Sequence, residues 1–305
     1  MPKTKFLAAL LAAALAGCAM STETPPAATG ADGLMVWLDL LERQRPEPSA
    51  TISYGDDAMQ KVDVWLPAGA GPHPTVLMVH GGCWQTEIAD RRIMNWIADD
   101  LRRRGMAVWN IDYRGVDRGP YPSTLLDAAE AADALRDHAA QYRLDLRRVV
   151  AIGHSAGGHL ALWLAARKNL TPGTIFNRNP LPIAAAISLG GLQDLELAAT
   201  PPGSGCGTEV VGRLVGMGLS ARPDVYADTS VPRMGPLGIP QVLINGAQDR
   251  IIPAFYAEDY RRKMAALGDH VRVRMIERTG HVELIAPETA AWEAAVEEIE
   301  QAFHR

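Results

Sequence analysis

Gly153-His154-Ser155-Ala156-Gly157 is the stretch that decides the fold, because it places the pattern G-x-S-x-G between two segments of different character. The apolar run 147–152 precedes it and predicts a buried strand, and residues 156–168 follow it with helical spacing. A strand that turns directly into a helix forces the residue at the turn into strained backbone angles, and flanking glycines relieve the crowding. We therefore predict that Ser155 is a nucleophile; the alternative is an ordinary turn serine.

Strands and helices alternate along most of the chain on either side of this stretch. The alternation predicts an α/β fold with a doubly wound, mostly parallel sheet, in which ligands bind beyond the C-terminal ends of the strands. The ranges expected as strands are 60–66, 75–79, 106–111, 147–152, 183–189, 240–244 and 271–276, and those expected as helices are 33–45, 89–104, 123–143, 156–168, 253–267 and 287–303.

The length and composition fit a single large domain. The chain has 305 residues, of which 48% are hydrophobic and 21% are charged, and its formal net charge is −5. Because it has no basic block, we expect no nucleic-acid partner. Residues 49–305 are expected to form the domain. Within it, the Gly/Pro-rich stretch 192–238 is long for a connection between two strands, so we expect a small cap insertion that shapes the substrate pocket.

The first residues predict export and lipid anchoring. Lys3 and Lys5 precede a short apolar run, and Leu15-Ala16-Gly17-Cys18 resembles a bacterial lipobox. We expect a signal peptide over 1–17 and lipidation of Cys18, with an ordinary secretory signal as the alternative. Residues 18–48 are then a tether and N-terminal segment. The expected location is the bacterial cell envelope, anchored in a membrane at the outer membrane or the periplasmic face.

A serine hydroxyl needs a base to take its proton, and the base needs a carboxylate to orient it. In this fold the order along the chain is serine, acid, histidine. Asp249 follows the predicted strand 240–244 and a glycine turn, and His281 follows the last predicted strand. We predict that Asp249 is the orienting acid and His281 the base. Asp194 at the end of the preceding strand is the rival acid, and Asp249 could instead be a turn or helix N-cap residue.

His80-Gly81-Gly82-Cys83-Trp84 follows the predicted strand 75–79, where this fold places donors for a developing oxyanion. Glycines let the backbone approach a substrate and direct its N–H groups. We predict that Gly81, Gly82 and Cys83 form the oxyanion loop, together with the N–H of Ala156. Trp84 is a candidate for the substrate pocket, with core packing as the alternative. No base is placed to make Cys83 a nucleophile.

The cysteines and histidines predict no cofactor. Export implies an oxidising compartment in which Cys83 and Cys206 could pair, but two scattered cysteines do not form a disulfide framework. No Cys or His cluster has the spacing of a metal site, so neither a metal nor another cofactor is expected.

Together these motifs resemble the α/β-hydrolase superfamily over about residues 50–303. Within it they are similar to the esterase/lipase-like branch, which includes hormone-sensitive-lipase-type and feruloyl-esterase-like carboxylesterases. The resemblance also includes the runs 62–67, Asp112-Tyr113-Arg114 and 153–161. It implies the α/β-hydrolase fold and a serine hydrolase that cleaves small-molecule carboxylic esters through an acyl-enzyme intermediate, with Ser155, Asp249 and His281 as its triad.

The same pattern is similar to kynurenine formamidase (arylformamidase), whose oxyanion signature is His-Gly-Gly-Tyr-Trp. This resemblance implies an amide hydrolase as the alternative activity. The chain departs from it at Cys83, where that family has tyrosine, and in its export signal. A third interpretation is a hydrolase fold that serves as a non-catalytic binding module, which the complete set of predicted triad residues disfavours.

Overall fold

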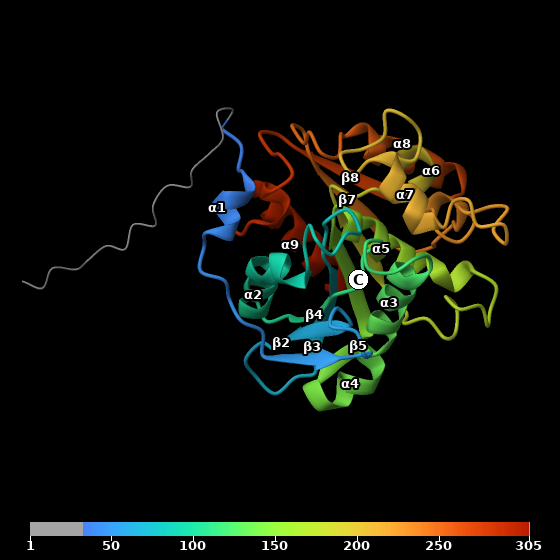
Figure 1. Cartoon of the computed structure of the whole chain (residues 1–305). Helices are drawn as coiled ribbons and strands as arrows, with labels where there is room; N and C mark the ends of the chain where they lie inside the picture. Colours follow the sequence, from blue (N-terminus) through green and yellow to red (C-terminus); the bar gives the residue numbers. More distant parts are fainter. Residues whose placement is uncertain (1–32, 305) are drawn as a thin grey trace, which may run out of the picture.

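The computed structural model describes residues 33–304; the predicted signal peptide and Cys18 lie outside the described residues. Within this range, an eight-stranded sheet has the order β1-β2-β4-β3-β5-β6-β7-β8 (Figure 1). The pairs β1–β2 and β2–β4 are antiparallel and all the others are parallel, which confirms the predicted fold class. The strands are β1 (Ala50–Ser53), β2 (Lys61–Trp65), β3 (His73–Val79), β4 (Ala107–Ile111), β5 (Leu144–His154), β6 (Ala185–Leu189), β7 (Gln241–Gly246) and β8 (Val271–Ile276).

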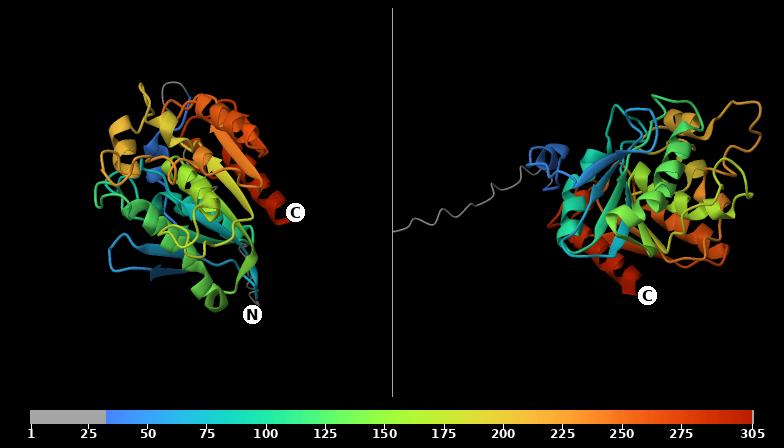
Figure 2. Two further views of the ribbon diagram at one scale, coloured as in Figure 1. Left: turned by 90° about the vertical axis from the view of Figure 1, so that its right-hand side faces the viewer. Right: turned by 90° about the horizontal axis from the view of Figure 1, so that it is seen from below.

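The sheet lies between two layers of helices (Figure 2). One face packs against α2 and α9, and the other packs against α3, α4, α5 and α8. The α-helices of the described range are α1 (Trp37–Leu41), α2 (Asn95–Arg103), α3 (Ser123–Asp133), α4 (Leu135–Tyr142), α5 (Ala156–Ala166), α6 (Leu195–Ala198), α7 (Thr208–Val215), α8 (Phe255–Ala266) and α9 (Ala290–His304).

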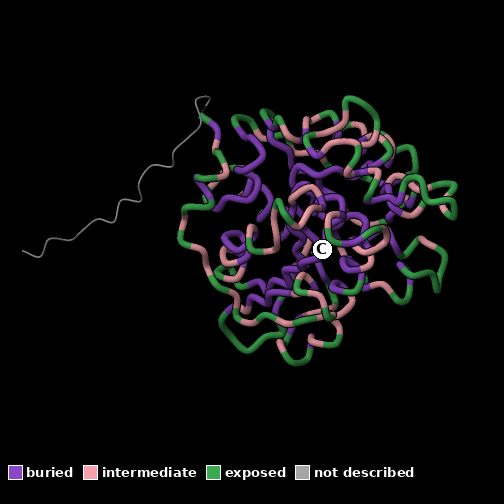
Figure 3. Tube along the Cα trace, in the orientation of Figure 1, coloured by how far each residue is buried: buried purple, intermediate pink, exposed green. Residues whose placement is uncertain are grey.

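Each face of the sheet contributes to its own hydrophobic core. In β3, Leu77 and Val79 belong to the core beneath α5, whereas Val76 and Met78 belong to the core beneath α2 and α9. Successive side chains of a strand point to opposite faces, so a strand buried on both sides must be apolar throughout. Figure 3 shows the buried residues gathered in this central region. The continuous apolar runs of the sequence follow from this arrangement.

Two predicted helices differ from those observed. The expected helix 123–143 divides at Ala134, where the N–H of Asp137 bonds to the Ala134 carbonyl across the three-residue spacing of a 3-10 turn. The expected helix 33–45 shrinks to α1. The N–H groups of Met35 and Val36 each bond to a carboxylate, of Glu283 and Asp39, at 2.7 Å. These bonds hold the preceding backbone extended.

The predicted cap insertion lies between β6 and β7 and contains α6 and α7. Side chains of α5 hold its C-terminal part: His159 Nε2 bonds to the Thr229 carbonyl and Trp163 Nε1 to the Asp228 carbonyl, both at 2.8 Å. Among residues 33–304, no helix is long and apolar enough to cross a membrane.

Candidate active site

Ser155 occupies the turn between β5 and α5. Its backbone has φ 54° and ψ −121°, in a region that residues with a side chain rarely adopt. A Cβ atom at Gly153 would lie 2.0 Å from the Gly157 carbonyl oxygen, and one at Gly157 would lie 2.2 Å from the Val79 carbonyl oxygen. Only glycine fits at these two positions. The G-x-S-x-G pattern therefore allows strand, serine and helix to pack this closely.

Asp249 and His281 meet through a short hydrogen bond. Asp249 lies on the loop after β7 and His281 on the loop after β8. The Nδ1 atom of His281 is 2.6 Å from Oδ2 of Asp249. An ionised carboxylate only accepts hydrogen bonds, so Nδ1 carries the proton and Nε2 is left as an acceptor. The other Asp249 oxygen accepts from the N–H groups of Ile251 and Ile252 at 2.8 and 2.9 Å.

The rival acid, Asp194, is engaged elsewhere. Its carboxylate caps α6 by accepting from the N–H of Leu197 at 3.1 Å. It also accepts from the hydroxyl of Ser230 at 3.1 Å and pairs with the Lys263 ammonium at 2.5 Å. Asp249, rather than Asp194, is the carboxylate bonded to His281.

Two residues outside the predicted triad hold the His281 loop. His154 Nε2 donates to the His281 carbonyl at 3.1 Å. Burial, and then the neighbouring His281, keep the pKa of His154 well below its ordinary value, so this ring stays neutral beside His281. Glu283 accepts from the N–H of Gly280 at 3.1 Å and from that of Met35 at 2.7 Å. The sequence assigned neither residue this role, because each acts on a partner that only the folded chain brings near.

The predicted oxyanion loop approaches Ser155 closely. Gly81, Gly82 and Cys83 line the same cavity as Ser155 and His281. A Cβ atom at Gly81 would lie 3.1 Å from Ser155 Cβ, and Gly82 and Cys83 have positive φ angles of 101° and 51°. In the part of the chain that the structure describes, the N–H groups of Gly82 and Cys83 form no hydrogen bond.

A buried polar network anchors this loop to the sheet. His80 Nε2 is 2.9 Å from Oδ1 of Asp112, whose other oxygen accepts from Arg91 at 2.9 Å. The Tyr113 hydroxyl donates to the His80 carbonyl at 3.0 Å, and the two rings stack with centroids 4.3 Å apart. The Asp112-Tyr113-Arg114 motif thus contributes to the site by positioning the loop that follows β3.

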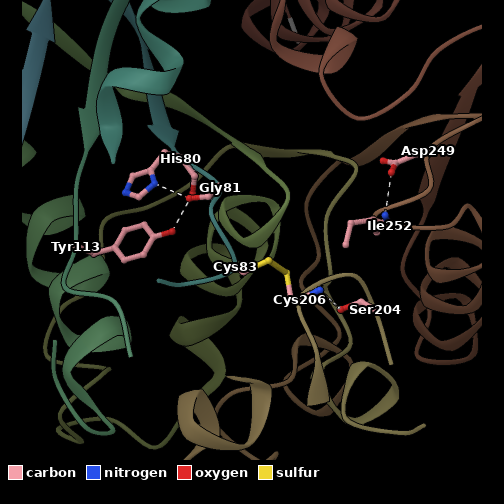
Figure 4. The surroundings of a disulfide bond; sticks show 8 residues. All are labelled: His80, Gly81, Cys83, Tyr113, Ser204, Cys206, Asp249 and Ile252. Atoms are coloured by element: carbon pink, nitrogen blue, oxygen red, sulfur yellow. Dashed lines mark hydrogen bonds between the residues drawn. A yellow bond between two sulfur atoms is a disulfide. The ribbon is translucent and has the colours of Figure 1, made fainter. Parts of the chain in front are cut away.

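A disulfide joins the loop to the insertion (Figure 4). Cys83 and Cys206, which are 123 residues apart in sequence, are bonded with an S–S distance of 2.06 Å. The adjacent Gly205 donates its N–H to the Ile251 carbonyl at 3.0 Å, two residues beyond Asp249. The covalent link therefore runs from the loop after β3 to the neighbourhood of the loop that carries Asp249. The sequence left open whether Cys83 and Cys206 pair, and in the structure they do.

These groups surround a cavity of about 430 Å³. Ser155, His281 and the predicted oxyanion loop form one part of its lining. The rest comes from Trp37, Leu41 and Arg45 near the N-terminus, from residues between 88 and 93, and from Gly205 and Ile251. The N-terminal contribution was not expected, because residues 18–48 showed no motif beyond an amphipathic pattern. Within residues 33–304, no group of three or more His, Cys, Asp or Glu side chains could hold a metal ion.

The expectation that Trp84 lines the substrate pocket is corrected. Its side chain is fully buried in the core beneath α5 and is absent from the lining of the cavity. Its ring packs edge-on against His159, with centroids 5.6 Å apart. A large apolar ring gains more from this buried position than from a solvent-filled cavity.

The chain matches known proteins over this region. The sequence model of the BD-FAE family matches residues 62–264. A probable isoprenylcysteine alpha-carbonyl methylesterase of Arabidopsis thaliana is 32% identical over 117 residues, which are 38% of this chain and 24% of that protein. A carboxylesterase of Mycobacterium tuberculosis is 27% identical over 153 residues, which are 46% of this chain and 47% of that protein.

A solved structure, a truncated form of a carbohydrate esterase from gut microbiota, superimposes with a TM-score of 0.71 at 19% identity, covering 85% of this chain and 98% of the other. At this identity the likeness shows the fold. The chain spans about a quarter of the length of the curated methylesterases that it matches: 24% of the Arabidopsis protein and 26% of its rice counterpart.

Proposed function

The chain belongs to the BD-FAE family, and we propose that it is a serine carboxylesterase that cleaves small-molecule esters. One observation carries the proposal: His281, oriented by a 2.6 Å hydrogen bond to Asp249, lines one cavity with the strained Ser155. The esterase names of several relatives support it.

The proposed reaction begins when the Ser155 hydroxyl attacks the ester carbonyl. Nε2 of His281 accepts the hydroxyl proton, while Asp249 holds the imidazole tautomer and stabilises its protonated form. The N–H groups of Gly82, Cys83 and Ala156 stabilise the negative oxygen that develops. His281 then protonates the leaving alcohol and afterwards activates the water that hydrolyses the acyl-enzyme. No step requires a cofactor.

The test is hydrolysis of p-nitrophenyl acetate and butyrate by the purified protein. We expect Ser155→Ala to lower kcat by about 10⁴-fold or more, because the nucleophile is lost. A fluorophosphonate probe should label the peptide that contains Ser155 in the wild type alone. Ser53→Ala on β1 is the matched control and should behave like the wild type. Unchanged hydrolysis in Ser155→Ala would overturn the mechanism.

The same assay addresses the amide alternative. The arylformamidase resemblance includes Trp84, but this chain has Cys83 where that family has tyrosine, and Cys83 is bonded to Cys206. N-formylkynurenine assayed beside the aryl esters should be a poor substrate. A higher kcat/KM for the formamide than for any ester would reverse the assignment.

The lipid anchor remains a separate proposal. We propose that residues 1–17 are removed, that Cys18 is lipidated, and that the enzyme is held at a membrane of the bacterial envelope. The sequence pattern before Cys18 supports this, and all of these residues lie outside the described part of the chain. An enzyme placed there would meet esters of the envelope or of the surroundings.

A further inference from the structure

The cavity beside Ser155 is mostly apolar, and one cation of its lining has no ion-pair partner among residues 33–304. Of its charged lining residues, Asp90 and Arg92 bind each other through several contacts between 2.5 and 3.0 Å. Arg45 is different. Among residues 33–304 its guanidinium forms no ion pair, and its Nε is buried without a hydrogen-bond partner.

The structure holds Arg45 in this place from both sides. The indole N–H of Trp96 donates to the carbonyl of Gln44 at 3.1 Å, and the amide of Asn95 donates to the carbonyl of Pro46 at 2.9 Å. The guanidinium lies over the Trp96 ring, 5.2 Å from its centroid. Two residues of α2 therefore fix the backbone on either side of Arg45, and a third contact supports its side chain. A group ordered in this way binds a ligand with little further loss of conformational freedom.

The chemistry of guanidinium indicates what this group binds. Its planar set of N–H donors matches a carboxylate and forms charge-assisted hydrogen bonds with it. These bonds are stronger in less polar surroundings, and the apolar side chains of Trp37, Leu41 and Ile93 line the same cavity. An unpaired cation also repels cationic ligands. An uncharged ester has no anionic group that could pair with it.

We propose that Arg45 is a specificity-determining residue that selects esters carrying a second, anionic group, such as a half-ester of a dicarboxylic acid. The proposal rests on the proposed esterase function and names its substrate class. Ser155 acts on the ester carbonyl at one part of the cavity while Arg45 binds the free carboxylate at another. Arg45 takes no part in the bond-breaking steps.

The test compares charged and uncharged substrates of equal chain length. The p-nitrophenyl half-esters of adipic and suberic acid are paired with p-nitrophenyl hexanoate and octanoate. A second series pairs 4-carboxyphenyl butyrate with phenyl butyrate, which places the anion on the alcohol side. In Arg45→Met we expect the ratio of kcat/KM, anionic over neutral, to fall about 10-fold to 100-fold in one series, mainly through KM. Arg45→Lys should be intermediate, because it keeps the charge without the planar donors.

Arg43→Met is the matched control, since it removes a cation two residues away whose guanidinium pairs with Glu288 outside the cavity. Its ratio should equal that of the wild type. Equal losses on charged and neutral esters in Arg45→Met would mean that Arg45 only supports the fold, and an unchanged ratio in both series would also overturn the proposal. If Arg45→Met does not fold, Arg45→Gln provides the same ratio. Neutral-ester hydrolysis that survives Ser155→Ala would instead overturn the proposed function.

Discussion

Backbone strain occurs at single residues in and beside the candidate site. Cys83, Trp84 and Ser155 are three of the seven non-glycine residues with positive φ in the described chain. Such conformations cost free energy, and they persist where the surrounding structure determines them. Gly153 and Gly157 supply that surrounding at Ser155, because any Cβ atom at either position would overlap a carbonyl. The strain directs the Ser155 side chain to the cavity that it shares with His281.

Single substitutions distinguish the roles of the two candidate acids, Asp249 and Asp194. We expect Asp249→Asn to lower kcat for p-nitrophenyl butyrate by about 10³-fold to 10⁴-fold, because an amide does not hold His281 in the tautomer with a free Nε2. Asp194→Asn should keep kcat near the wild-type value. It should lower the free energy of unfolding in urea by up to about 1 kcal/mol, since the amide can still cap α6 but loses the ion pair with Lys263. Full activity in Asp249→Asn would exclude it as the orienting acid.

The insertion between β6 and β7 is joined to the rest of the domain at several elements. Its Cys206 is bonded to the loop after β3, its Gly205 to the loop after β7, and its residues 228–229 to α5. These links place the insertion beside the cavity, where it contributes Gly205 to the lining. Two predictions follow at the scale of these elements.

The first concerns the disulfide. Reduction releases a loop of 123 residues, for which chain entropy predicts a stability loss of about 4–5 kcal/mol. We also expect kcat to fall by up to about 100-fold, since the Cys83 N–H is no longer held at the proposed oxyanion position. The measurements are thermal unfolding and ester hydrolysis with and without dithiothreitol. The double variant Cys83→Ser, Cys206→Ser should have the unfolding temperature and kcat of the reduced wild type. Dithiothreitol should change neither value in this variant. Identical oxidised and reduced wild-type protein would contradict this expectation.

The second concerns His159, which joins α5 to the insertion. Burial lowers the pKa of His159 to about 4, whereas an unfolded histidine has a pKa of about 6.5. Between these values only the unfolded chain takes up the proton, so stability is full above pH 6.5 and is lost as the pH falls toward 4. The loss is on the order of 3 kcal/mol. Urea unfolding from pH 7.5 to 4.5 should show a smaller decline in His159→Gln than in the wild type. Parallel curves would contradict the assignment.

At the scale of the whole molecule, the N-terminal segment lies beside the candidate site. Met35 bonds to Glu283 at 2.7 Å, and Trp37, Leu41 and Arg45 line the cavity. Residues 35–45 therefore run beside the candidate site.

Substitution of Cys18 tests the anchor. We expect the wild type to incorporate radiolabelled palmitate in a bacterial host and to sediment with the membranes, because several acyl chains on one residue anchor a protein stably. Cys18→Ala should lose both properties while retaining ester hydrolysis. The matched control is Cys206→Ser, which leaves Cys18 in place and should still be labelled. A wild-type protein without label, found in the soluble fraction, would show that there is no lipid anchor.

The sequence by itself determined seven of the eight strands and the turn at Ser155, because these depend on local patterns; the edge strand β1 was not predicted. Apolar runs predict strands buried on both faces, and the G-x-S-x-G glycines are required by contacts within one strand–turn–helix unit. The order Ser155, Asp249, His281 predicted three loops at one edge of the sheet, where the structure places them. Their catalytic roles stay a prediction.

Only the tertiary structure decided which distant groups meet. The bond of His281 to Asp249 rather than Asp194, the pairing of Cys83 with Cys206, the burial of Trp84 and the place of Arg45 in the cavity each depend on elements far apart in the chain. Local propensity carries no information about such contacts, because their free energy arises only when the layers of the fold have packed.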